Sequence, residues 1–250
     1  TPSLGPHALY TVSDESLGWI SDYAEKENLL IHFHLAETQQ ENKDCVKRYG
    51  KRPVQLLDDI GFLGENLVCA HCIWLTREEM RILAGNNVKV SHNPTSNLKL
   101  ASGKLNYSEM KANNLLISLG TDGSASNNNL DLFEEMKFAC LGQKMLAGDP
   151  TVLPARQALK MSTVNGAKAL NINAGEISEG KLADLILIDL RRPELTPLHN
   201  LTSLLVYSAG GSCVDTMICD GNILMEDGKV EGEAEILSKV QEVAKDLISR

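Results

Sequence analysis

Histidine and carboxylate residues occur where short apolar segments of the sequence end. His34 and Glu37 follow one such segment, His71 ends a second, and Asp122 follows a third. Imidazole and carboxylate groups bind divalent metals and transfer protons. Metal-assisted acid–base chemistry is therefore a candidate function, and the alternative is that the histidines are hydrogen-bonded residues of a packed sheet.

The segment that carries His34 has the pattern of a β-strand that leads into a helix. Ile31 and Phe33 are expected on one face of the strand, and His32 and His34 on the other, because strand side chains alternate. Thr38 is a favourable N-cap for the polar helical segment that follows. His34 is therefore expected at the carboxyl end of a strand, the rim at which barrels and open α/β sheets build their active sites.

The order strand, polar residue and helix occurs four times in the first part of the sequence. Strands that alternate with helices are expected to be parallel, with right-handed crossovers, so their carboxyl ends share one rim. A barrel can gather four successive strand ends around one point, whereas a doubly wound sheet cannot. The predicted strands cover residues 29–35, 67–71, 88–92 and 115–121, and they deliver His34, His71, His92 and Asp122 to this rim.

Two other histidines receive structural interpretations. His32 is expected to fill the interior of the barrel beneath His34. His92 is expected to support the rim through hydrogen bonds to the loop that contains Asn93 and Asn97, and it is left outside the catalytic set.

Further helices are predicted between and after these strands from residues that favour helix starts. The segment Thr76-Arg77-Glu78-Glu79 is a capping box. Either Asn127 or Asn128 is predicted to cap a later helix. A single helix is predicted over residues 155–170, after the break at Gly148-Asp149-Pro150.

The sequence changes character after residue 172. Strand-like segments at 180–189, 214–219 and 222–225 are separated by Asp-Gly turn signals, which indicates a small β domain. An amphipathic helix is predicted at the carboxyl terminus. The expected division is residues 1–172 for the α/β region, 173–232 for the β region and 233–250 for the terminal helix.

Composition narrows the range of functions. A net charge of −9 and a pI near 5.2 argue against binding to nucleic acid or an anionic membrane. No apolar run approaches the ~20 residues of a membrane span, and the start does not resemble a signal peptide. Six scattered cysteines fit a reduced cytoplasmic protein. Cys69 and Cys72 form a C-x-x-C pattern, but in a strand-like run their thiols would point to opposite faces, which argues against redox chemistry.

Six blocks of the sequence resemble the amidohydrolase superfamily, most closely the 5′-methylthioadenosine/S-adenosylhomocysteine deaminases and their chlorohydrolase relatives. The blocks run in family order across nearly the whole chain. They are Gly5-Pro6-His7, His34-Leu35-Ala36-Glu37-Thr38, Ala70-His71-Cys72, Ser91-His92-Asn93-Pro94-Thr95-Ser96-Asn97-Leu98-Lys99-Leu100, Gly120-Thr121-Asp122-Gly123 with Asn127-Asn128-Asn129, and Gly180-Lys181-Leu182-Ala183-Asp184-Leu185. The H-x-E and P-C-x-x-C signature of the other zinc deaminases is absent from the sequence.

The resemblance implies a role for each residue of the predicted site. His34 and Asp122 would be metal ligands, and Asp122 would also take a proton from the attacking water. Glu37 would contact the substrate and protonate the purine ring nitrogen beside the attacked carbon. His71 would orient the hydroxide and stabilise the tetrahedral adduct, and His7 would contact the substrate. Zinc is the expected metal, with iron and manganese as alternatives.

The resemblance also implies residues that precede this sequence. The family carries an H-x-H pair of metal ligands on its first barrel strand, and no such strand precedes Gly5. The expected fold is therefore the second half of a TIM-type (β/α)8 barrel followed by part of a small β-sandwich domain. Such a chain is expected to be inactive alone, and to associate with copies of itself or with a complementing amino-terminal segment.

The main functional hypothesis is metal-dependent hydrolytic deamination of 5′-methylthioadenosine, S-adenosylhomocysteine or a related adenosine compound in the cytoplasm. The expected partner is a small purine nucleoside, with no nucleic acid and no membrane. One alternative is a chlorohydrolase or an aminohydrolase of another heterocycle. The alternative outside the enzymes is a non-catalytic fragment that binds ligands or subunits.

Overall fold

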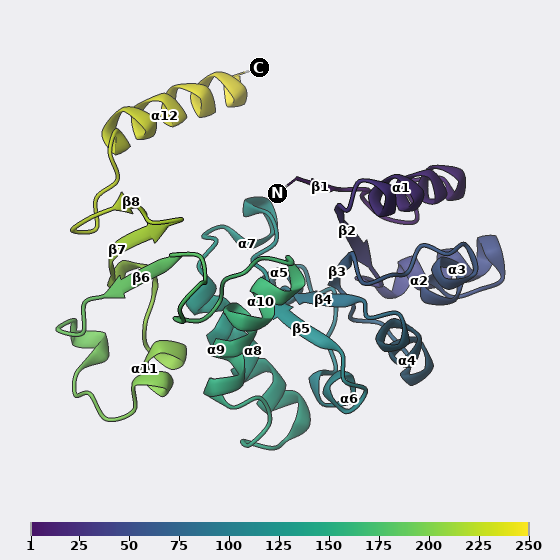
Figure 1. The fold of residues 1–250 in the computed structure, drawn as a ribbon, viewed down its shortest axis with the longest axis horizontal. Coiled ribbons are helices and arrows are strands. Elements are labelled where there is room, and N and C mark those ends of the chain that lie inside the picture. The colour runs from purple at the N-terminus through teal and green to yellow at the C-terminus, as the bar shows by residue number, and fades with distance from the viewer. Residues whose placement is uncertain (1, 250) are drawn as a thin grey trace.

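The computed structural model describes residues 2–249, which contain two separate sheets (Figure 1). The larger sheet has five parallel strands, each hydrogen-bonded to its neighbour in sequence. The carboxyl ends of all five strands therefore lie along one edge. The strands are β1 (Ser3–Leu4), β2 (Leu30–Leu35), β3 (Leu67–His71), β4 (Lys89–His92) and β5 (Leu116–Leu119).

Helices connect and follow these strands. Figure 1 shows α1, α2, α3, α4 and α6 along the same side of the sheet. This alternation confirms the predicted α/β class with parallel strands. The helices are α1 (Asp14–Lys26), α2 (Gln39–Tyr49), α3 (Pro53–Asp59), α4 (Arg77–Gly85), α5 (Pro94–Lys99), α6 (Tyr107–Ala112), α7 (Ser124–Asn127), α8 (Leu132–Ala147), α9 (Ala155–Ser162) and α10 (Val164–Ala169).

The two faces of β2 have opposite character. Ile31 and Phe33 are buried, whereas His32 is exposed and His34 is half-buried. The ring of Phe33 meets that of Phe62 edge to face, with 5.3 Å between the ring centroids. The predicted alternation is confirmed, and complete burial of side chains of this size contributes ~1.5–3 kcal/mol each.

The predicted starts of α2 and α4 are also confirmed. The hydroxyl of Thr38 accepts a hydrogen bond from the Glu41 backbone N–H at 3.1 Å. Thr76 and Glu79 form the reciprocal capping box, with distances of 3.2 and 2.8 Å. Gly50 ends α2 with a φ of 70°, a conformation that glycine adopts without steric cost.

The strand β1 corrects the sequence prediction, which has four strands in this region. Its two residues pair with the start of β2, Ser3 opposite Leu30 and Leu4 opposite Ile31. A strand of this length shows no alternation of polar and apolar residues, so sequence periodicity cannot reveal it.

The start of α8 is a second correction. The helix begins at Leu132 with Asp131 as its N-cap, and neither Asn127 nor Asn128 caps it. Asn128 and Leu130 have φ values of 84° and 63°, so the backbone between α7 and α8 is not helical. Left-handed residues at these positions make a connecting loop, where the sequence prediction begins the helix.

The segment predicted as one helix over residues 155–170 is two helices. Thr163, with φ −121° and ψ −94°, lies outside the helical conformation and separates α9 from α10. Asn165 donates a hydrogen bond to the carbonyl of Ile117 at 2.8 Å, which attaches α10 to β5. The break therefore redirects the chain onto the sheet.

The smaller sheet is antiparallel and contains the strands expected from the sequence. Between β6 (Leu185–Ile188) and β7 (Val214–Cys219) the chain forms two short 3-10 helices and α11 (Leu201–Tyr207). Asp220 and Gly221 both have positive φ, 48° and 78°, as a tight hairpin turn requires. The strands are β6 (Leu185–Ile188), β7 (Val214–Cys219) and β8 (Asn222–Met225).

The last helix, α12 (Glu233–Ser249), has no buried residue and projects away from both sheets in Figure 1. Its apolar stripe is exposed, with Val243 at 67% and Leu247 at 70%. Across residues 2–249, the structure contains no helix with both the length and the apolarity needed to cross a membrane.

Candidate metal and catalytic site

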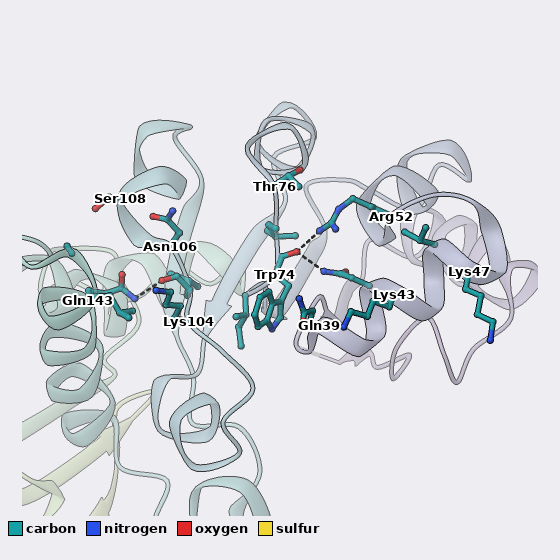
Figure 2. A pocket seen from close by; sticks show the side chains of 17 residues that line it. Gln39, Lys43, Lys47, Arg52, Trp74, Thr76, Lys104, Asn106, Ser108 and Gln143 are labelled. Atoms are coloured by element: carbon teal, nitrogen blue, oxygen red, sulfur yellow. Dashed lines mark hydrogen bonds between the residues drawn. The ribbon is translucent and has the colours of Figure 1, made fainter.

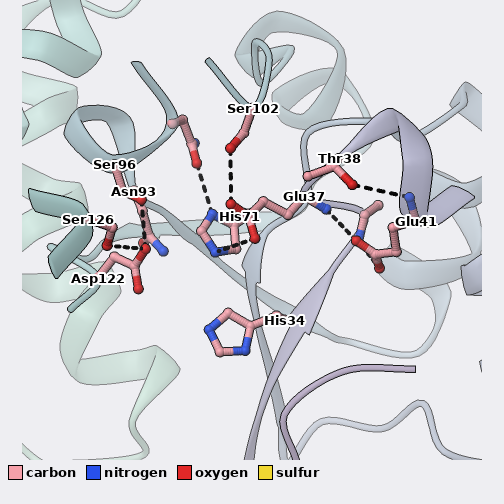
Figure 3. Close-up of polar contacts among 12 residues, drawn as sticks. His34, Glu37, Thr38, Glu41, His71, Asn93, Ser96, Ser102, Asp122 and Ser126 are labelled. Atoms are coloured by element: carbon pink, nitrogen blue, oxygen red, sulfur yellow. Dashed lines mark hydrogen bonds and ion pairs between the residues drawn. The ribbon is translucent and has the colours of Figure 1, made fainter. Parts of the chain in front are cut away.

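Three of the predicted site residues bring potential metal ligands together (Figure 3). His34 lies near the end of β2, His71 at the end of β3, and Asp122 in the loop that follows β5. One nitrogen or oxygen atom from each side chain lies within 4.8 Å of the other two. Two imidazoles and a carboxylate form a donor set that divalent transition metals accept.

The orientation of His34 is fixed by the chain near His7. The carbonyl oxygen of His7 lies 2.9 Å from Nδ1 of His34 and also accepts the backbone N–H of His34 at 3.0 Å. A carbonyl oxygen only accepts, so this contact places a proton on Nδ1 and leaves the lone pair on Nε2. The ring of His7 lies beside that of His34, with 5.1 Å between centroids, and its own Nδ1 is 2.9 Å from the hydroxyl of Thr11.

His71 is held by an asparagine from the next rim loop. Its side chain is 1% exposed, and its Nδ1 lies 2.8 Å from Oδ1 of Asn97 in α5. This contact again assigns the proton to Nδ1. Nε2 then carries the lone pair and lies 3.6 Å from a carboxylate oxygen of Glu37. The positive φ of His71, 69°, turns the chain out of β3 at this residue.

Glu37 is positioned by two residues that the sequence analysis missed. The buried carboxylate of Glu41 accepts the backbone N–H groups of Ala36 at 2.8 Å and Glu37 at 2.9 Å. The hydroxyl of Ser102 donates a hydrogen bond to the side-chain carboxylate of Glu37 at 3.0 Å. Burial raises the pKa of Glu41, although the backbone hydrogen bonds oppose this. The Thr38-x-x-Glu41 spacing of a capping box is the signal that could have identified Glu41.

Asp122 is kept ionised by its hydrogen bonds. One carboxylate oxygen accepts the hydroxyls of Ser96 at 2.6 Å and Ser126 at 2.8 Å, and the other accepts the Gly123 N–H at 2.8 Å. Burial raises the pKa of Asp122, but these three hydrogen bonds outweigh it and bring the pKa below its ordinary value. The carboxylate is therefore available as a ligand and as a proton acceptor at neutral pH.

His92 is buried at the end of β4, but the expected hydrogen bonds to Asn93 and Asn97 do not occur. Among the described residues its Nδ1 has no partner, and Asn97 contacts His71 instead. Burial, with a smaller contribution from His71, lowers the pKa of His92 to about 3. The predicted contact is wrong because the Asn97 side chain, on α5, is directed toward His71 at the end of β3 and not toward His92.

Glu135 is a further residue that sequence reasoning missed. It is fully buried in α8 and accepts the Thr95 N–H at 3.1 Å and the Asn127 amide at 2.6 Å. Asn127 also donates to the carbonyl of Thr121, next to Asp122, at 2.7 Å. Burial raises the pKa of Glu135, partly offset by these hydrogen bonds. An acidic residue in the first turn of a helix usually lies on the surface, so the pattern gives no sign of this contact.

A cavity of about 450 Å³ lies beside His34 and Asp122, which line it together with His32 and His7. His32 is thus on the same side as His34, as predicted, and burial lowers its pKa with a smaller contribution from His34. The chain packs closely at Gly120: a Cβ atom there would lie 2.5 Å from the hydroxyl oxygen of Ser91, so the Ser91 side chain would have to move.

Comparison with known proteins agrees with this geometry. The profile of the amidohydrolase family matches residues 1–224. This match includes the parallel sheet and all of the predicted site residues. The chain belongs to the amidohydrolase family.

Similar sequences include two archaeal deaminases. A 5′-deoxyadenosine deaminase of Methanothermobacter thermautotrophicus is 51% identical over 229 residues, which cover 92% of this chain and 54% of that protein. A 5-methylthioadenosine/S-adenosylhomocysteine deaminase of Archaeoglobus fulgidus is 47% identical over 249 residues, covering 98% of this chain and 59% of that protein. The chain therefore spans somewhat more than half the length of these relatives.

Similar structures include an adenosine deaminase from Xanthomonas campestris with bound zinc. It has a TM-score of 0.96 and 34% sequence identity, over 99% of this chain and 57% of that one. An atrazine chlorohydrolase from Arthrobacter aurescens, complexed with zinc, has a TM-score of 0.88 at 22% identity, over 96% of this chain and 54% of that one. The second likeness concerns the fold alone.

Proposed function

We propose that the intact protein carrying this chain is a metal-dependent hydrolytic deaminase of an adenosine compound, with 5′-deoxyadenosine, 5′-methylthioadenosine and S-adenosylhomocysteine as the candidate substrates. The observation that carries the proposal is the convergence of His34, His71 and Asp122 within 4.8 Å, with Glu37 beside His71. The deaminases at 47% and 51% identity support an adenosine compound as the substrate class.

The side chains fit a divalent metal. His34 has Nε2 free because its Nδ1 contacts the His7 carbonyl, Asp122 presents an ionised carboxylate, and a ring nitrogen of His71 lies within 4.8 Å of both ligand atoms. His34 and Asp122 would hold the metal, with zinc as the first candidate and iron or manganese as alternatives. When bound, such a metal supplies Lewis acidity and makes water more acidic.

The proton chemistry follows from the surroundings of the carboxylates and His71. Asp122 is ionised and accepts hydrogen bonds from the hydroxyls of Ser96 and Ser126, and it accepts a proton from the attacking water. Glu37, held by Ser102 and the Glu41 loop, donates a proton to the purine ring nitrogen next to the attacked carbon. His71 holds the attacking oxygen in place through Nε2. The carbon–nitrogen bond to the amino group then breaks, and the proton from Asp122 leaves with ammonia. The second proton of the water passes to Glu37 as the carbonyl group forms, which restores the protonated Glu37.

The fold also supports a division of this chain into three regions. We propose that residues 1–172 form the second half of a TIM-type barrel, residues 173–232 part of a β-sandwich domain, and residues 233–250 a separate helix. The parallel sheet ends at β1 on one side and β5 on the other, as an incomplete barrel would. His7, which lies beside His34, is proposed to contact the substrate. The six free cysteines fit a reducing compartment such as the cytoplasm.

The test is ammonia release by the intact protein with zinc present. We expect release from at least one of the three adenosine compounds, and none from the matching inosine compounds, which lack the amino group. Glu37→Gln is expected to keep the metal and lose the activity. Release of chloride from a chloropurine nucleoside without ammonia release from any adenosine compound would favour a chlorohydrolase, and binding without either reaction would favour a non-catalytic role.

A further inference from the structure

A second and larger cavity lies outside the candidate site. It has a volume of about 830 Å³, within the range of small-molecule sites, and shares no lining residue with the cavity beside Asp122. Its walls come from α2, the loop before α4, the loop before α6 and the end of α8 (Figure 2).

The charge of this cavity is opposite to that of the chain. Among the 17 residues that line it, four are cationic and none is acidic, although the whole chain has 33 acidic and 24 basic residues. Arg52 is paired with Glu79 at 2.8 Å. Lys43, Lys47 and Lys104 form no ion pair with any residue between 2 and 249. Uncompensated lysines around a concave surface raise the local concentration of anions.

The indole of Trp74 provides a fixed planar surface in the same cavity. Its N–H donates to the carbonyl of Ser102 at 2.7 Å, and its own carbonyl accepts from Asn42 at 2.7 Å and Arg52 at 2.6 Å. A Cβ atom at Gly103 would lie 2.9 Å from the indole nitrogen, so the chain packs closely against the ring. Figure 2 shows Lys104 on one side of Trp74 and Lys43 on the other.

We propose that this cavity binds a small planar organic anion, an aromatic ring that carries a phosphate or carboxylate group. The ring lies against Trp74, and the anionic group is bound by Lys43 and Lys104. A fixed aromatic side chain stacks on a planar ligand at little cost in conformational entropy. The cavity shares no lining residue with the cavity beside Asp122, and Ser102 is in contact with both Trp74 and Glu37.

Isothermal titration calorimetry on the intact protein tests the proposal with two pairs of probes. Uridine 5′-monophosphate is compared with uridine, and indole-3-acetate with indole-3-acetamide. None of these carries the adenine amino group. We expect at least one anion to bind at least about tenfold more tightly than its neutral partner.

Variants then locate the binding. The double variant Lys43→Gln/Lys104→Gln should weaken binding of the anion by about tenfold, because two charge interactions are lost. Lys160→Gln, an exposed lysine on α9, is the matched control and should leave binding unchanged. Trp74→Leu should weaken binding of both members of a pair. Equal binding of anion and neutral partner in both pairs, no binding by either anion, or full affinity in the double lysine variant would each overturn the proposal.

Discussion

The parallel sheet and the carboxyl-terminal region differ in how their apolar side chains are covered. In the sheet, Phe33 and Leu67 are 2% and 0% exposed and belong to one continuous core. In the carboxyl-terminal region, Ile223 of β8 is 58% exposed and Leu247 of α12 is 70% exposed. An apolar surface as extended as that of α12 usually meets another surface.

The residues of the candidate site all lie in one of these two regions, the parallel sheet and its helices. All predicted site residues lie between His7 and Asp122, on elements with their own buried core. The carboxyl-terminal region meets the parallel-sheet region through α8 and α9: α11 packs against both helices, and the Gly211 N–H donates to Asp131 at 2.7 Å, at the start of α8. The parallel-sheet region thus carries every residue of the candidate site, whereas β8 and α12 leave apolar side chains exposed.

Asp122→Asn should have the largest effect. The variant loses the charge that is proposed to act as ligand and proton acceptor, so metal content should fall and turnover should drop by at least ~10²–10⁴. Asp227→Asn is the matched control, because Asp227 also precedes a glycine and has a positive φ of 51°. Steady-state ammonia release and metal analysis measure both. If the two variants are equally active, the site does not lie in the parallel-sheet region.

Glu37→Gln should separate proton transfer from metal binding. Because Glu37 is proposed to donate a proton without holding the metal, turnover should fall by ~10²–10⁴ while the metal content stays normal. Glu179→Gln removes an exposed carboxylate near the second sheet and should change neither quantity. Normal turnover by Glu37→Gln would exclude its role as proton donor.

Core truncation tests the difference in packing directly. Phe33→Ala leaves a cavity in the buried core and should reduce the free energy of unfolding by ~3–5 kcal/mol. Leu247→Ala, at an exposed position of α12, should change it by less than ~0.5 kcal/mol in the isolated chain. Urea denaturation followed by circular dichroism measures both. A large loss for Leu247→Ala would show that α12 packs on the chain itself.

Glu135→Gln should have the smallest effect, and it depends on pH. The pKa of Glu135 in the fold is raised above 4.5, so the folded chain binds this proton more tightly than the unfolded chain. Its contribution therefore favours the fold at low pH and is lost as pH rises through the raised pKa. The variant should lose ~1–3 kcal/mol from its weakened hydrogen bonds. Its stability should also change less with pH than that of the wild type.

The exposed control for this experiment is again Glu179→Gln. It should retain the pH dependence of the wild type, because Glu135 is unchanged in it. Urea denaturation between pH 4 and 8 compares the three proteins. An unaltered pH dependence in Glu135→Gln would show that Glu135 does not titrate differently in the folded and unfolded chains.

Much of the sheet and the meeting of the ligands could be predicted from sequence, because both follow from local pattern. Alternation identified β2, and strand ends placed His34, His71 and Asp122 on one rim. The two-residue strand β1 carries no such pattern. Its place depends on pairing with β2 across a long connection.

The residues that hold the site residues in place are harder to predict from local sequence pattern. Glu41 could have been found from its capping-box spacing, although it bonds to the loop before Thr38 as well as to the cap region. Ser102 reaches Glu37 and Glu135 reaches Thr95 across long stretches of sequence. Contacts of this kind depend on the folded arrangement of rim loops, which spacing alone does not contain.

The central claim is that His34 and Asp122 hold one metal, with His71 beside it, and that this metal serves the proposed deaminase reaction. The most direct measurement is an anomalous difference map of the intact protein, recorded on both sides of the zinc absorption edge from crystals of a sample that releases ammonia. We predict a peak next to Nε2 of His34 and the carboxylate of Asp122, on the side that His71 faces. A metal bound only elsewhere, or full deaminase activity in crystals and solution that hold no metal, would contradict the account.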